Sequence, residues 1–214
     1  MIDIQSKNVA VIVAHPDDET LWAGGTILNH TKWKCFIITV CRGSDADRAP
    51  KFYRALKIYH SVGAMGDLDD GPEQTPIDQK ELEETILNLL PQQAYDLIIT
   101  HDPSGEYTRH LRHEEVSKAV INLWYNNKIA AHEMYTFAYE DGNKMYYPRA
   151  IKEAPICNKL SDEIWQIKYH VLNDIYGFEE KCWELKTTPH KESFWHFTTP
   201  LEAYKWLNKR GLHK

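Results

Sequence analysis

The sequence predicts an α/β protein with a largely parallel sheet and helices on both faces of that sheet. Short apolar runs, suited to strands that are buried on both sides, alternate with segments of helical periodicity. The runs cover residues 9–14, 35–40 and 95–101, and a further strand is predicted over 132–140. Strands that alternate with helices of about ten to fifteen residues are typical of βαβ units. We therefore expect a Rossmann-like arrangement.

Helices are predicted between and after these strands. They cover residues 18–30, 47–60, 78–90 and 114–125. The first begins with Asp18 and Glu19, whose charges suit the positive end of a helix. The third carries Leu82 and Ile86 on one face, and Pro91 ends it.

The amino-acid composition of the sequence changes near residue 150. Four of the seven tryptophans lie beyond it, and an amphipathic helix is predicted over 160–175. No Gly/Ser/Pro-rich linker precedes this aromatic-rich C-terminal extension. We therefore expect a single domain, residues 1–214, made of an α/β core over about 1–150 and a C-terminal lobe over about 151–214.

Composition argues against several classes of protein. The net charge of −6 gives no overall positive field for nucleic acid or anionic membranes, so no nucleic-acid partner is expected. The four cysteines form no C-x-x-C pair and no dense disulfide framework. No apolar run reaches the roughly 18 residues that a membrane span requires, and the run over 9–14 is too short for a signal peptide. We expect a cytoplasmic protein, and leave self-association into a homo-oligomer open.

The loops after the first and third apolar strands are rich in histidine and aspartate, and ligands bind at this edge of an open parallel sheet. In the first loop, His15 and Asp18 lie close enough in sequence to bind one metal ion, while Asp17 could hold its water. The alternative is that the acidic residues only cap the helix.

In the second loop, His110 and His113 share one face of a helical turn. The alternative there is a pair of solvated histidines. Together the two loops could form a hydrolytic site.

The segment AHPDDE, residues 14–19, resembles the signature of the PIG-L/LmbE-like metal-dependent deacetylases. The later Gly105, Glu106, Tyr107, His110, His113 and Val116 resemble their second motif. That family usually has His-Pro-Asp-His where this chain has His-Leu-Arg-His over 110–113, so both histidines are kept. It includes the N-acetylglucosaminyl-phosphatidylinositol de-N-acetylases and the bacterial deacetylases of mycothiol and bacillithiol synthesis. The resemblance covers roughly residues 8–140.

The resemblance implies a reaction and the residues for it. His15, Asp18 and His113 would hold a divalent ion, usually zinc, with Fe²⁺ as the other candidate. Asp17 would be the general base, and His110 would steady the oxyanion, as an imidazolium, or protonate the leaving amine. The implied activity removes the N-acetyl group from an N-acetylglucosamine-containing glycoside or conjugate, with a metal-bound water as nucleophile. The expected partner is thus a small acetylated sugar conjugate.

Substrate contacts are less constrained by the sequence. Arg42, Asp45, Tyr107 and Arg109 are candidates for contacts to sugar hydroxyls or a phosphate, as is Arg112, although surface arginines are usually solvated. Tryptophans of the C-terminal extension could stack on a sugar, but large aromatic side chains are more often core. His101 is expected to be structural.

Two other functions stay open at this point. One is a metal-dependent hydrolase of a non-sugar amide or ester. The other is a non-catalytic nucleotide- or sugar-binding α/β module, against which the absence of G-x-G-x-x-G after the first strand argues.

Overall fold

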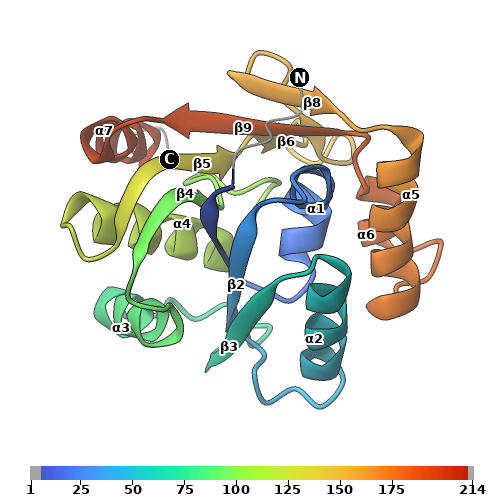
Figure 1. Ribbon diagram of the computed structural model, residues 1–214, viewed down its shortest axis with the longest axis horizontal. Helices are drawn as coiled ribbons and strands as arrows, with labels where there is room; N and C mark the ends of the chain where they lie inside the picture. The colour runs from blue at the N-terminus through green and yellow to red at the C-terminus, as the bar shows by residue number, and fades with distance from the viewer. Residues whose placement is uncertain (1–5, 212–214) are drawn as a thin grey trace.

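The computed structural model describes residues 6–211, so both ends of the predicted domain 1–214 lie outside the described residues. Its main-sheet strands are β1 (Asn8–Val13), β2 (Lys34–Cys41), β3 (Val62–Leu68), β4 (Ala94–Thr100), β5 (Ala130–Phe137), β8 (Ile156–Lys159) and β9 (Lys191–Phe197). They form one seven-stranded sheet in the order β3-β2-β1-β4-β5-β9-β8 (Figure 1). The first five strands pair in parallel, and β9 runs antiparallel to β5 and β8. The short strands β6 (Tyr139–Glu140) and β7 (Arg149–Ala150) pair separately.

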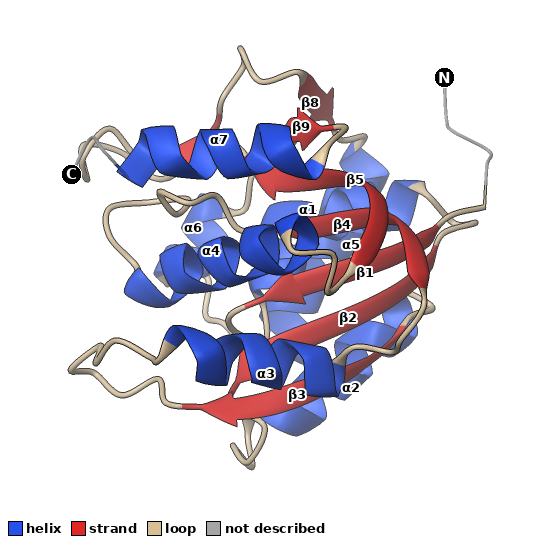
Figure 2. Cartoon of the chain, turned by 90° about the vertical axis from the view of Figure 1, so that its left-hand side faces the viewer, coloured by secondary structure: helices blue, strands red, loops and turns tan. Residues whose placement is uncertain are grey.

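Helices cover both faces of this sheet (Figure 2). One face carries α1 (Asp18–Asn29), α2 (Arg48–Ile58), α5 (Asp162–His170), its π-helical continuation η1 (Val171–Ile175) and α6 (Trp183–Thr187). The other carries α3 (Gln79–Leu89), α4 (Leu111–Tyr125) and α7 (Pro200–Gly211). Along β1, Val9 and Val11 pack against the first group of helices while Ala10 and Ile12 pack against the second. This alternation on a strand buried on both faces explains why its sequence is continuously apolar. The predicted fold class is confirmed.

Strand β3 was not predicted by the sequence. It lies at the edge of the sheet, where β2 is its one neighbour among residues 6–211. Its residues are mostly half-buried, so they lack the apolar run that marks the central strands. Gly63 sits so close to β2 that a Cβ atom there would lie 2.1 Å from the carbonyl oxygen of Ile37. The glycine that weakens the strand signal therefore permits the close approach of the two backbones.

The C-terminal part of the chain completes the sheet with β8 and β9, and the predicted boundary near residue 150 falls between β7 and β8. Glu192 on β9 is buried and accepts hydrogen bonds from the backbone N–H groups of Gly25 and Thr26 in α1, at 2.8 and 2.6 Å. The same carboxylate pairs with the buried ammonium of Lys168 on α5, at 2.7 Å. One buried carboxylate thus joins α1, α5 and the sheet.

The two loops singled out by the sequence meet at the carboxyl edge of the sheet. β1 and β4 are neighbours in the sheet, and the connection after β1 leads to β2 on one side while the connection after β4 leads to β5 on the other. A crevice forms outside the strand ends at such a switch point, and ligands of open α/β sheets bind there. The loops that follow β1 and β4 face each other across this crevice.

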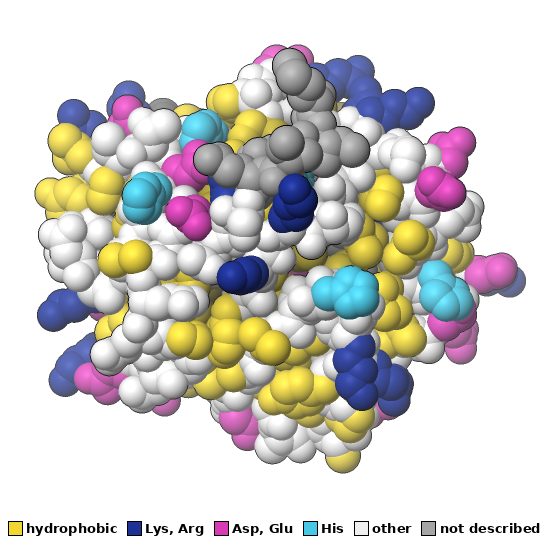
Figure 3. Space-filling view, in the orientation of Figure 1, with side chains coloured by type: hydrophobic (Ala, Val, Ile, Leu, Met, Phe, Trp, Pro, Cys, Tyr) yellow, Lys and Arg dark blue, Asp and Glu magenta, His cyan; other side chains and the backbone are white. Residues whose placement is uncertain are grey.

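Among the described residues, no helix is both long and apolar enough to cross a membrane. On the face shown in Figure 3, the Lys and Arg side chains of these residues are scattered among acidic, apolar and neutral ones.

Candidate metal centre and catalytic site

Asp17 occupies an unusual backbone position at the start of α1. It is the N-cap residue, with φ 124° and ψ −27°, a conformation that L-residues rarely adopt. Its backbone N–H donates to the carboxylate of Glu19 at 3.0 Å, and the hydroxyl of Tyr176 donates to the same carboxylate at 2.7 Å. The Glu19 side chain is fully buried. Glu19, the last acidic residue of the first motif, therefore stabilises the strained turn at Asp17.

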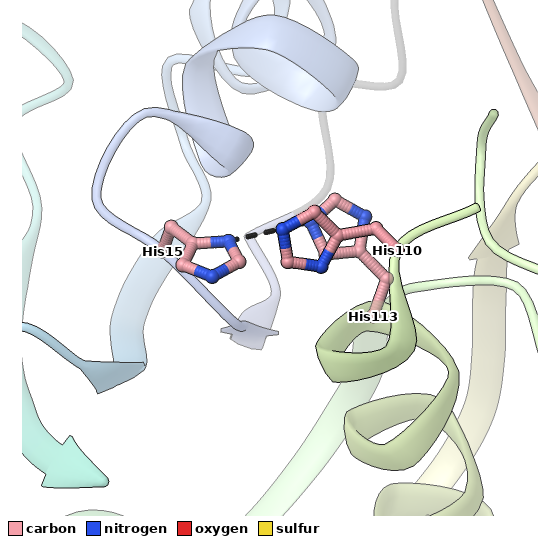
Figure 4. Close-up of side chains that lie close together, drawn as sticks. All are labelled: His15, His110 and His113. Atoms are coloured by element: carbon pink, nitrogen blue, oxygen red, sulfur yellow. Dashed lines mark hydrogen bonds between the residues drawn. The ribbon is translucent and has the colours of Figure 1, made fainter. Parts of the chain in front are cut away.

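His15, Asp18 and His113 converge across the crevice. Nδ1 of His15 lies 3.1 Å from Oδ2 of Asp18 and 3.3 Å from Nε2 of His113, and the latter two atoms are 3.4 Å apart. Figure 4 shows the His15 ring on the β1 loop pointing toward His113 at the start of α4, with His110 beside it. Ligands about 2.0–2.2 Å from a tetrahedral zinc ion lie roughly 3.3–3.6 Å from one another. The three donor atoms are thus spaced closely enough to hold one ion.

Neighbouring side chains, of which Glu106 and Trp22 are fully buried, orient these three residues. Glu106 accepts from Nδ1 of His113 at 2.6 Å, and Asp70 contacts Nε2 of His15 at 3.0 Å. Trp22 donates its indole N–H to Oδ1 of Asp18 at 3.2 Å. A carboxylate on the second nitrogen of a histidine fixes its tautomer and leaves the first nitrogen free to bind a metal. This donor set fits a divalent cation.

Two further histidines border this cluster and differ in role. His101 is fully buried, and its Nε2 accepts from the backbone N–H of Ala14 at 3.0 Å while its Nδ1 contacts Glu106 at 3.0 Å. Both of its nitrogens thus have partners within the protein, and it also forms a group with Asp18 and His113 whose donor atoms lie within 4.8 Å of one another. The structural role expected of His101 stays a prediction. His110 stacks on His113 with ring centroids 4.4 Å apart. Its Nδ1 is buried without a hydrogen-bond partner among the described residues, so it remains free for a ligand.

The pKa values of the two adjacent aspartates, Asp17 and Asp18, are shifted in opposite directions. Burial, together with the charge of Asp18, raises the pKa of Asp17 well above its usual value. For Asp18, burial acts in the same direction, but His113 and the other two imidazoles outweigh it and lower the pKa well below its usual value. Asp18 is thus an anionic donor, while Asp17 is a stronger proton acceptor than an ordinary carboxylate.

The pKa of His110 is shifted down to about 3 by burial and by the neighbouring His113 and His15. The ring is therefore neutral at pH 7 in this structure, and a neutral imidazole can still donate an N–H to an oxygen. An imidazolium at His110 stays a prediction.

A cavity of about 170 Å³, the catalytic cavity, opens over the cluster. Among the predicted substrate contacts, Arg42 and Tyr107 line it. Asp45 instead pairs with Arg42 at 3.1 Å and accepts backbone N–H groups at the start of α2. Arg109 turns away and pairs with Glu114 at 3.1 Å. The structure does not bring Asp45 or Arg109 into this cavity, and their substrate roles stay predictions. Arg112 is fully buried against Glu115.

Five cavity residues were not singled out for the site by the sequence: Leu21, Arg48, Asp70, Trp183 and Glu184. Arg48 lies 3.4 Å from the carboxylate of Asp17. Asp70 follows β3, so recognition of that strand and of the rule that ligands bind at strand ends would have found it. Trp183 belongs to the group of C-terminal tryptophans. The sequence does not distinguish a tryptophan that stacks on a ligand from one that packs in the core.

The fold and the site define a class of α/β proteins that gather histidines and carboxylates at the carboxyl edge of a parallel sheet, in the manner of metal-dependent hydrolases. Comparison with protein families places the chain within this class. Residues 10–124 match the family PIG-L, GlcNAc-PI de-N-acetylase, and the chain belongs to this family of metal-dependent de-N-acetylases. The resemblance drawn from the two sequence motifs is thereby confirmed.

Individual relatives are distant. An uncharacterised protein of Acanthamoeba polyphaga mimivirus is 25% identical over 175 residues, which is 74% of either chain. N,N'-diacetylchitobiose deacetylase from Pyrococcus horikoshii has a TM-score of 0.68 at 16% identity, covering 93% of this chain and 85% of that one. A conserved protein from Thermus thermophilus has a TM-score of 0.59 at 16% identity, covering 88% of this chain and 94% of that one. At these identities the solved structures show a shared fold.

Proposed function

We propose that this protein is a zinc-dependent hydrolase that removes the N-acetyl group from a small N-acetylglucosamine-containing glycoside or conjugate. The observation that carries this proposal is the triangle of donor atoms on His15, Asp18 and His113, with Asp17 and His110 at its side. Membership of the de-N-acetylase family supports the reaction class. We further propose that the enzyme acts in the cytoplasm.

Each residue has a part in this proposal. A divalent ion held by His15, Asp18 and His113 would supply a water whose pKa lies near 7. Asp17 takes a proton from the attacking water and returns it to the departing amine nitrogen, so that acetate and a free amine are the products. His110 donates its free ring N–H to the acetamide oxygen as negative charge develops there. Arg42 and Tyr107, which line the catalytic cavity, contact the sugar.

The proposal is tested by metal analysis of protein purified without chelators, combined with acetate release from a panel of N-acetylglucosamine glycosides. We expect about one zinc per chain and release of acetate. Metal without acetate from any sugar, but with turnover of simple amides or esters, would favour a non-sugar hydrolase. A protein that binds no zinc even after its addition would instead be a non-catalytic binding module, and the proposal would be wrong.

A Glu106→Gln variant should bind zinc roughly 10- to 100-fold more weakly, the usual effect of losing a carboxylate behind a histidine ligand. Burial alone would raise the pKa of Glu106, but its contacts with His101 and His113 lower it to about 2, so the native side chain is an anion. The neutral amide removes that charge. Competition with a chromophoric chelator measures the affinity without reference to activity. Glu114→Gln, in the first turn of α4 but paired with Arg109, is the matched control. Equal affinities in the two variants would contradict the assigned role of Glu106.

A further inference from the structure

A second cavity, of about 510 Å³, adjoins the catalytic cavity, and we refer to it as the accessory cavity. Tyr107 and Trp183 line both cavities, and their rings meet edge to face with centroids 4.7 Å apart. The same two rings therefore form a wall of each. A group attached to a substrate in the catalytic cavity can reach the accessory cavity by passing over this pair.

The loop over residues 141–148, between β6 and β7, forms the other side of the accessory cavity. The carboxylate of Asp141 accepts from the backbone N–H and the hydroxyl of Thr108, both at 2.7 Å. This ties the loop to the segment that carries the second motif. Gly142 has φ +59°, and a Cβ atom there would lie 2.4 Å from the ring of Tyr146. The turn of this loop therefore requires glycine at position 142.

The accessory cavity presents apolar side chains to solvent. Met145 is 80% exposed and Tyr147 is 45% exposed, and both line it. Large apolar side chains gathered beside a site in this way mark a surface that binds a ligand. Covering them removes apolar area from water and therefore favours binding.

Three polar side chains of the accessory cavity are engaged within the protein, while Lys144 adds one charged group to its lining. Thr108 and Asp141 bind each other, and the hydroxyl of Tyr146 donates to Glu140. The guanidinium of Arg149 lies over the ring of Tyr146, 4.0 Å from its centroid. A second sugar would bring several hydroxyls that each need a hydrogen-bond partner when buried. An apolar group makes no such demand.

We propose that the accessory cavity binds an apolar aglycone, an aryl or alkyl group carried by the acetylated amino sugar. This inference rests on the proposed deacetylase function and specifies its substrate class. Tyr107 and Trp183 separate the sugar from the aglycone, while Met145 and Tyr147 cover the apolar group.

The test compares acetate release from the phenyl and methyl glycosides of N-acetylglucosamine and from diacetylchitobiose. We expect the phenyl glycoside to have a kcat/KM about tenfold above that of the methyl glycoside. In a Met145→Ser/Tyr147→Ser double variant, this ratio should fall toward one. Leu201→Ser, at a side chain that is 47% exposed on α7, is the control and should keep the ratio of the native enzyme. The ratio does not depend on the amount of folded protein.

Equal kcat/KM for the phenyl and methyl glycosides, or a preference for diacetylchitobiose over the phenyl glycoside, would overturn this inference and leave the deacetylase function intact. If the zinc-loaded protein releases acetate from none of them, the proposed function is wrong. Calorimetric titration with the same glycosides then tests whether the accessory cavity binds an apolar aglycone. Tighter binding of the phenyl glycoside than of the methyl glycoside, lost in the double variant, supports this inference. Equal affinities for the two glycosides, or no binding of either, overturn the inference.

Discussion

An Asp17→Asn variant is expected to lose about 10³-fold in kcat for acetate release, while it still binds about one zinc per chain. A general base contributes roughly 10²- to 10⁴-fold to a rate, and asparagine cannot accept the proton. Asparagine is the appropriate replacement because it tolerates the positive φ of this position better than most residues and keeps the backbone N–H that Glu19 binds. The measurement is steady-state acetate release together with metal content.

Asp47→Asn is the matched control for this experiment, because Asp47 also lies at the start of a helix but its side chain is 69% exposed and pairs with Lys51. Its kcat should remain that of the native enzyme. Full activity in the Asp17→Asn variant would show that another group accepts the proton, and the assigned base would be wrong.

The largest effect on stability is expected at Glu192. Its replacement by alanine removes the partner of the fully buried Lys168 and the acceptor of N–H groups in α1. An unpaired buried charge costs about 3–5 kcal/mol. In a chain of this size, each kcal/mol lowers Tm by roughly 2–4 °C, so a decrease of roughly 10 °C is expected. Thermal and denaturant unfolding, followed by circular dichroism, measure the change.

Glu84→Ala provides the comparison, because the ion pair of Glu84 with Lys80 is exposed on α3 and such pairs contribute little. A combined Glu192→Gln/Lys168→Met variant should recover part of the lost stability, since it leaves no buried charge without a partner. A Glu192→Ala variant as stable as Glu84→Ala would mean that water or a rearrangement compensates the charge of Lys168.

The central part of the fold could be predicted because its strands are buried on both faces. β1, β2 and β4 carry continuous apolar runs, and the helices beside them carry clear apolar stripes. The signal fails where only part of a strand is buried. β3 contains two glycines and lies at an edge, while β8 and β9 mix aromatic, charged and polar residues. Pairing between β9 and β5 depends on contacts between segments far apart in the sequence, which no local pattern reveals.

The candidate site likewise has a part that the sequence predicts and a part that it does not. The two histidine- and aspartate-rich loops could be proposed as one site because each follows a central strand and both meet at one edge of the sheet. The choice of His15, Asp18 and His113 within them came from the resemblance to the PIG-L/LmbE-like family. Two supports of the site could not be proposed. Asp70 follows the unpredicted β3, and Tyr176 reaches Glu19 from the C-terminal extension. Such residues are placed by tertiary packing, and their spacing in sequence carries no information about it.

The hydrogen bond from Tyr176 to Glu19 also has a consequence for synthesis on the ribosome. The two residues are 157 positions apart, so at about 5–20 residues per second a nascent chain waits roughly 10–30 s between them. His15 and Asp18 are made before that interval and His113 within it, while the turn at Asp17 still lacks this support. Later in synthesis β5 has an open edge from the time residues 130–137 emerge, and β9 closes that edge only when residues 191–197 emerge. The growing polypeptide therefore acquires all three metal-donor residues before the hydrogen bond that completes the turn at Asp17.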